Sequence, residues 1–120
     1  MILRFHLMLV EDDPRVFVVG AEPPDAAAWG FGAEAPFPLD PDRWREERQY
    51  DRSDPAAALS AFGRRRREVL ALLGRLSPAE WERGCIHPTR GRWTFADWTV
   101  GMVHHDDAHV EQLRRALPPS

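Results

Sequence analysis

The sequence contains a single cysteine, Cys85, so no disulfide bond can form within the chain. A chain without disulfide bonds suits a reducing compartment, and we therefore expect a cytoplasmic protein. Lysine is absent, and all 16 basic residues are arginine. The net charge of −3 leaves no basic surplus, which argues against a general nucleic-acid-binding protein.

Long apolar runs are also missing. The apolar stretch at residues 1–10 is interrupted by Arg4 and His6, and three acidic residues at 11–13 follow it directly. A membrane-spanning helix needs about 20 apolar residues, and a signal peptide needs a small-residue cleavage site, which does not follow here. We therefore expect neither an export signal nor a membrane span.

Length and composition fit one small globular domain, residues 1–120. A chain of 120 residues is long enough for one hydrophobic core but not for two. Its hydrophobic content of 43% is ordinary for a folded protein, so disorder along the whole chain is not expected.

Helix-start signals recur along the chain, each with a capping residue followed by proline or, three residues on, by a carboxylate. They stand at Asp40–Pro41, Asp54–Pro55, Ser77–Pro78 with Glu80, and Thr94 with Asp97. We expect helices over residues 2–13, 41–49 and 55–76, a short one from 78, and a long one over 94–117. Proline and glycine favour a loop over residues 20–41, and residues 84–93 are also expected to be a loop. The expected fold class is all-α.

The helix expected over residues 94–117 carries two histidines on its apolar side. Steps of three and four place seven residues on one face. These are Phe95, Trp98, Met102, His105, His109, Leu113 and Leu117. The two imidazoles then lie one turn apart on the inward seam, the spacing at which both can bind one metal ion. The alternative is a pair of core histidines bonded to polar neighbours, but two in register on an apolar seam favour the metal.

Four further sites carry reactive or charged side chains: His6, His87, Cys85 and the arginines at 64–67. His6 shares a face of the first helix with Ile2 and Leu9, which makes it a third histidine on an apolar face. We interpret His87, beside a proline, as a surface residue. Cys85 is interpreted as a small buried residue, and the arginines at 64–67 as a solvated helix face.

Several segments resemble the DinB-like superfamily of small helical proteins. They read DPDRWREERQY, DPAAALSAFGRRRREVLALLGRLSPAEWERG and IHPTRGRWTFADWTVGMVHHDDAHVEQLRRAL. The closing H-x-x-x-H-x-x-Q of His105, His109 and Gln112 is similar to the last-helix motif of that family. The H-L-x-x-x-E that begins at His6 is similar to its first-helix motif.

The resemblance implies a four-helix bundle with a divalent metal ion held by three histidines, His6, His105 and His109. Only five residues precede His6, so we expect a truncated first helix. The stretch rich in proline and glycine stands where relatives have a second helix, which we expect to be poorly formed. Imidazole suits both zinc and nickel, with zinc as the first choice. Glu11 and Gln112 are candidate partners of these ligands.

The resemblance also implies a class of chemistry. Relatives include transferases and isomerases that use the small thiols bacillithiol or mycothiol, and many family members form homodimers. We therefore expect a divalent-metal-binding protein that is a thiol-dependent S-transferase or a metal-dependent hydrolase. Its partners would be a small-molecule thiol or another small substrate, and a second copy of the chain. The alternative is a catalytically silent helical-bundle module, also dimeric, with vestigial or structural histidines.

Overall fold

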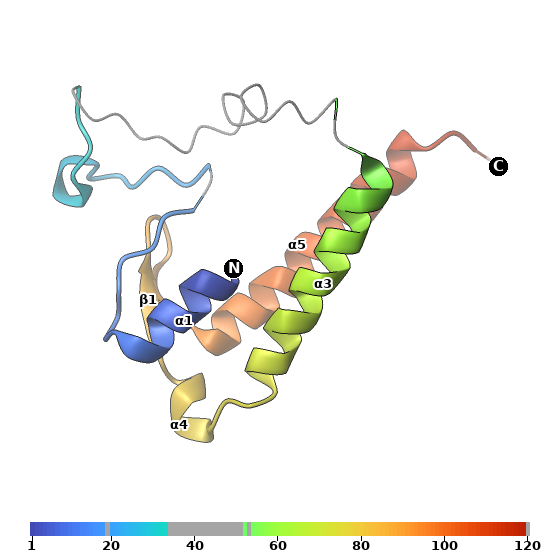
Figure 1. The fold of residues 1–120 in the computed structure, drawn as a ribbon. Coiled ribbons are helices and arrows are strands. Elements are labelled where there is room, and N and C mark those ends of the chain that lie inside the picture. The colour runs from blue at the N-terminus through green and yellow to red at the C-terminus, as the bar shows by residue number, and fades with distance from the viewer. Residues whose placement is uncertain (19, 34–51, 53, 120) are drawn as a thin grey trace.

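The computed structural model describes residues 1–18, 20–33, 52 and 54–119 (Figure 1). Its elements are α1 (Ile2–Val10), the 3-10 helix η1 (Ala27–Trp29), α3 (Pro55–Leu73), α4 (Pro78–Trp81), β1 (Gly84–His87), β2 (Gly91–Thr94) and α5 (Phe95–Ala116). The described chain is thus mostly helical, as expected, but it includes a small two-stranded sheet. It is therefore not a pure four-helix bundle. The helix expected over residues 41–49 lies outside the described residues.

The predicted helix starts after residue 50 are confirmed. The Asp54 side chain accepts a hydrogen bond from the backbone at the start of α3. Ser77 and Glu80 form a reciprocal capping box at α4, and Thr94 and Asp97 form another at α5. Each box satisfies backbone N–H groups that a helix start leaves without an intrahelical partner. Local sequence chemistry therefore fixes where these three helices begin.

Residues 84–93, expected to be a loop, instead form most of a β-hairpin. The antiparallel strands β1 and β2 pair in a register that places Gly84 opposite Thr94 and His87 opposite Gly91. Gly91 has a φ of 73°, a left-handed conformation that an L side chain rarely adopts and that lets the chain turn here. The hairpin matters because it brings the His87 ring to 5.7 Å from the Trp98 ring, between centroids, in the first part of α5.

The amino-terminal segment closes onto the hairpin. The backbone N–H of Val16 donates a hydrogen bond to the carbonyl oxygen of Ile86 at 3.1 Å. The N–H of Ile86 in turn donates to the carbonyl oxygen of Pro14 at 2.8 Å, so that Arg15 forms a β-bridge with Ile86. Arg83 donates to the carbonyl of Met8 at 2.7 Å, near the end of α1. These bonds join the first helix to the hairpin across more than half the length of the chain.

A glycine in the hairpin provides the first test of this packing. A Cβ atom added to Gly84 would lie 2.8 Å from the carbonyl oxygen of Trp93, which is backbone and has little freedom to move. We therefore expect Gly84→Ala to lower the free energy of unfolding by about 1–3 kcal/mol, measured by urea denaturation. Gly32→Ala is the control, because a Cβ there meets nothing within 4 Å. Equal stability of the two variants would contradict the described hairpin.

The core lies where α1, α3, α4, the hairpin and the first turns of α5 meet. Its buried hydrophobic residues are Phe5, Met8, Val16, Val69, Leu72, Leu73, Cys85, Phe95, Trp98 and Met102. The Phe5 ring packs edge-on against Phe95 and Trp98, with ring centroids 5.1 and 6.5 Å apart. The inward positions of α1 are thus Phe5 and Met8. The predicted inward placement of His6 is wrong, because His6 is exposed one residue along from Phe5.

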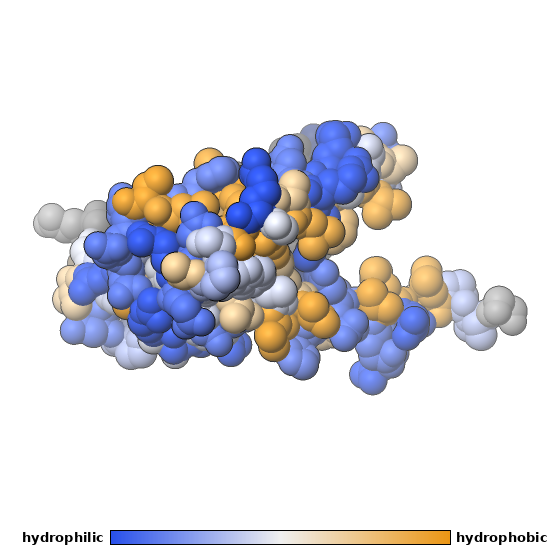
Figure 2. Space-filling model, turned by 90° about the horizontal axis from the view of Figure 1, so that it is seen from below, coloured by the Kyte–Doolittle hydropathy of each residue, from blue (hydrophilic) through white to orange (hydrophobic). Residues whose placement is uncertain are grey.

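Helices α3 and α5 run antiparallel and then separate. Arg66 of α3 bonds to Asp106 of α5, N to O 2.9 Å, and Figure 1 shows the two helices side by side around this level. In Figure 2 their far halves stand apart as two arms that carry hydrophobic residues. The predicted inward face of α5 is therefore buried only as far as Met102. Beyond it His105, His109 and Leu113 are exposed, because none of the described elements covers them. No helix in the described part of the chain has the length and apolarity needed to cross a membrane.

Candidate functional site

His105 and His109 lie one turn apart on α5 and face each other. Their Nε2 atoms are 3.1 Å apart and their ring centroids are 4.4 Å apart. Both side chains are exposed, and that of His105 has a relative accessibility of 69%. The spacing in the sequence therefore predicted the contact between these imidazoles correctly. The predicted position on a buried face is wrong, because both side chains are exposed.

The outer nitrogens of the pair have their own acceptors. The Nδ1 atom of His109 lies 3.0 Å from the amide oxygen of Gln112, which can only accept a hydrogen bond. The Nδ1 atom of His105 lies 3.6 Å from a carboxylate oxygen of Asp106, which favours a proton on that nitrogen. In the neutral rings this leaves two Nε2 lone pairs that face the same point. A proton or a cation at that point would satisfy both, and Gln112 is placed as the orienting partner that histidine ligands of metals usually have.

His6 is not brought to this pair. It lies on the exposed side of α1, whereas Phe5 beside it enters the core. Among the residues that the structure describes, no group of three or more histidine, cysteine, aspartate or glutamate side chains is placed to hold a metal ion. Glu11 ends α1 and contributes its backbone carbonyl to a hydrogen bond from Arg83. The structure thus assembles two of the three predicted ligands.

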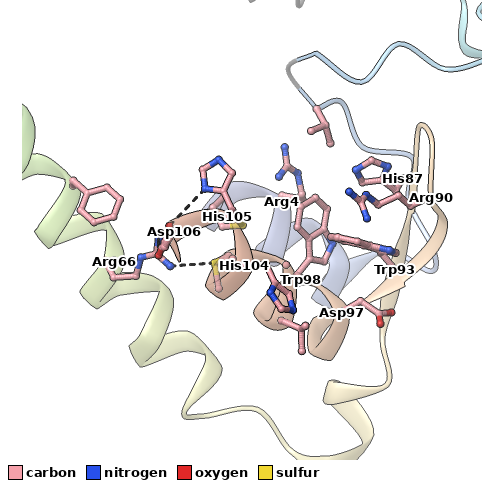
Figure 3. Close-up of a pocket in the computed structure, with 16 residues that line it drawn as sticks. Arg4, Arg66, His87, Arg90, Trp93, Asp97, Trp98, His104, His105 and Asp106 are labelled. Carbon is pink, nitrogen blue, oxygen red and sulfur yellow. Dashed lines mark hydrogen bonds and ion pairs between the residues drawn. The ribbon is translucent and has the colours of Figure 1, made fainter. Parts of the chain in front are cut away.

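A cavity of about 770 Å³ is lined by His105, the first member of the histidine pair (Figure 3). Its walls come from α1, α3, the hairpin and α5. His105 and Asp106 lie at the end near α3, together with Arg66. A cavity of this size can hold a small organic molecule.

The opposite end of the cavity is formed by aromatic rings and cations. The Trp93 and Trp98 rings meet edge to face, with centroids 4.8 Å apart. The guanidinium of Arg4 lies 4.6 Å from the centre of the Trp98 ring, and that of Arg90 lies 4.9 Å from the centre of the Trp93 ring. His87 completes this end, with its ring 5.1 Å from that of Trp93.

The interpretation of His87 as a surface residue is wrong, since its relative accessibility is 6%. It was missed because residues 84–93 were not recognised as a hairpin. A signal was present, because Gly91 stands between two short stretches that contain β-branched and aromatic residues. The predicted burial of Cys85 is confirmed, and burial raises the pKa of its thiol. The Trp98 indole N–H also donates to this sulfur at 3.2 Å.

The environment of His87 predicts a pH dependence of stability. Burial, and then the positive charges of Arg90 and Arg4, lower the pKa of His87 below its ordinary value. The unfolded chain therefore binds this proton at a higher pH than the folded chain does. We expect the stability that neutral His87 provides to be full above a pH of about 6.5 and to fall as the pH decreases below that value. Urea denaturation between about pH 5 and pH 7.5 should show a weaker pH dependence of stability in His87→Gln than in the wild type. The exposed His104→Gln is the control, and an unchanged slope in His87→Gln would contradict this assignment.

Comparison with known proteins adds one match. The family model described as DinB superfamily matches residues 5–113, which include all three predicted histidine ligands. Neither the curated proteins nor the solved structures contain a match to the chain.

Proposed function

Because the chain belongs to the DinB superfamily, we propose that it binds a divalent metal ion, zinc or nickel, through His6, His105 and His109. The observation that carries the proposal is the 3.1 Å separation of the Nε2 atoms of His105 and His109. Two nitrogen ligands at about 2.0–2.1 Å from one tetrahedral zinc ion stand roughly 3.3 Å apart. The pair therefore already has a separation suited to two ligands of a single ion.

The third ligand has to come from α1. His6 follows Phe5, which packs against Phe95 and Trp98, so α1 is held against the same helix that carries the pair. The imidazole of His6 is not beside the pair in the described structure. The proposal therefore requires His6 to approach the pair when the ion binds, and substitution of His6 tests this requirement separately.

We propose that the bound ion serves a small-molecule reaction, as a thiol-dependent S-transferase or a metal-dependent hydrolase. When bound, such an ion lowers the pKa of a water or thiol ligand enough to generate a nucleophile near neutral pH. The chain would contribute the orientation of His109 through Gln112 and a cavity beside His105 for the substrate. Arg66 and Asp106 would keep α3 and α5 together at the cavity edge.

A second candidate function is a helical module without catalysis. One observation favours it, namely that the described residues assemble no group of three potential metal ligands. In that case the contact between His105 and His109 would be an ordinary hydrogen bond between two imidazoles, with the proton on one Nε2 atom.

The metal content of the purified chain distinguishes the two functions. Mass spectrometry of the metals in protein dialysed against zinc or nickel should find about one ion per chain if the three-histidine site forms. A content near that of a His105→Ala, His109→Ala double variant would select the silent module.

We also propose that a second copy of the chain covers the two separated arms, the far halves of α3 and α5. Both arms carry exposed large hydrophobic residues. These are Leu59 and Phe62 on α3, and Val110 and Leu113 on α5. Such residues on two sides of one opening favour association, and a two-fold pairing would bury both arms at once. Sedimentation equilibrium at micromolar concentration should find a homodimer. A monomer that melts well above the range of about 45–65 °C would contradict this proposal.

A further inference from the structure

The hairpin end of the cavity carries positive charge without a matching carboxylate. Arg4 is half-buried and donates one hydrogen bond, at 2.8 Å, to the carbonyl oxygen of Phe17. Arg90 makes no hydrogen bond or ion pair with any residue in the described ranges. Both guanidinium groups lie over tryptophan rings, which leaves the N–H groups along their edges open to another partner, apart from the one that Arg4 donates to Phe17.

The acidic residues that line the cavity are engaged elsewhere. Asp106 pairs with Arg66 at the far end. Asp97 accepts hydrogen bonds from the backbone and the hydroxyl of Thr94, and Figure 3 shows it turned away from Arg4 and His87. The positive charge of Arg4 and Arg90 is therefore not neutralised within the described part of the cavity.

His87 adds a hydrogen-bond donor to these cations. Its Nδ1 atom accepts a hydrogen bond from the backbone N–H of Thr89 at 3.1 Å, so the neutral ring carries its proton on Nε2. That Nε2–H has no partner among the described residues. Among the described residues, every fully buried side-chain nitrogen or oxygen has a hydrogen-bond partner. Since the Nε2 atom of His87 has none, it is accessible to solvent. His87 is only 6% accessible and lines the cavity, so its Nε2–H group is accessible from the cavity.

We propose that Arg4, His87 and Arg90 form a subsite for the oxyanion group of a small organic acid. Arg4 and Arg90 supply charged donors, and His87 supplies a neutral one fixed by Thr89. Charge-assisted hydrogen bonds to an oxyanion are among the strongest that proteins form. The apolar part of the ligand lies along the cavity wall formed by Val100, Gly101 and Met102. A half-buried guanidinium without a carboxylate partner, such as Arg4, gains most from an anion that the ligand brings.

The subsite uses none of the three proposed metal ligands, so it can be tested on metal-free protein. The full chain, treated with a chelator, would be titrated with benzoate, phenyl phosphate and the neutral benzyl alcohol. Binding would be followed by NMR through the indole N–H resonances of Trp93 and Trp98. We expect saturable binding of at least one anion and binding of benzyl alcohol weaker by about tenfold or more. Preference for benzoate would identify a carboxylate ligand, and preference for phenyl phosphate a phosphorylated one.

Variants of Arg90 locate the site, because this side chain is exposed and its replacement should leave the fold intact. Arg90→Gln should weaken binding of the preferred anion by about tenfold, and Arg90→Lys should restore part of the loss. Arg75→Gln is the matched control, since Arg75 is exposed in the turn that follows α3 and does not line the cavity. The subsite is overturned if neither anion binds, if benzyl alcohol binds as tightly, or if Arg90→Gln binds like Arg75→Gln.

Discussion

Replacing Phe5 with alanine should cost the protein about 3–5 kcal/mol of stability, the largest loss expected from a single core substitution. The Phe5 side chain is fully buried and joins α1 to α5 through its contacts with Phe95 and Trp98. Domains of this size are stable by only about 5–15 kcal/mol, so most of the folding free energy of a marginal chain would be lost. Urea denaturation followed by far-ultraviolet circular dichroism measures the effect.

Leu3 provides the control for Phe5. It lies on the same helix, it is also hydrophobic, and its relative accessibility is 81%. Leu3→Ala should change the free energy of unfolding by no more than about 0.5 kcal/mol. If both variants lose the same stability, α1 does not pack on α5 through the face described.

The second large effect concerns the proposed metal site. His109→Ala should abolish stoichiometric binding of zinc, because two imidazoles and water rarely hold a divalent ion tightly. Loss of an outer partner of a metal ligand already costs about 10–100-fold in affinity, and loss of the ligand itself should exceed that. A zinc titration of the wild type and the variant in the presence of a competing chelator measures the change.

His104 is the matched control for His109. It precedes His105 directly, it is exposed like the pair, and none of the described contacts joins it to His109. His104→Ala should therefore bind zinc as the wild type does. Equal weakening by His104→Ala and His109→Ala would mean that zinc binds to the histidines of α5 without a defined site.

Local sequence chemistry predicted the helix starts well. Ser77 with Glu80 and Thr94 with Asp97 form their capping boxes because the partners are only three residues apart. The contact between His105 and His109 was predictable for the same reason, since helical spacing alone places them together. Features fixed within one turn of a helix need no knowledge of the rest of the fold.

Features that depend on distant segments were not predictable in this way. Helical periodicity identifies an apolar face, but it does not say how far along the helix a neighbour covers that face. On α5 the cover ends near Met102, so His105 and Leu113 are exposed although they continue the same stripe. The cationic end of the cavity was missed because Arg4 and Arg90 lie 86 positions apart in the sequence. They line the same cavity only because α1 and the hairpin both pack against α5.

The most direct test of the central proposal is the number of histidine ligands around a bound zinc ion. X-ray absorption spectroscopy of the zinc-loaded chain should find about three imidazole nitrogens at roughly 2.0–2.1 Å. His6→Ala leaves only two imidazoles, as His109→Ala does, and should likewise lose stoichiometric binding of zinc. Stoichiometric zinc with an unchanged imidazole count in His6→Ala would contradict the assignment of His6, and a wild-type chain that binds no zinc would contradict the three-histidine site as a whole.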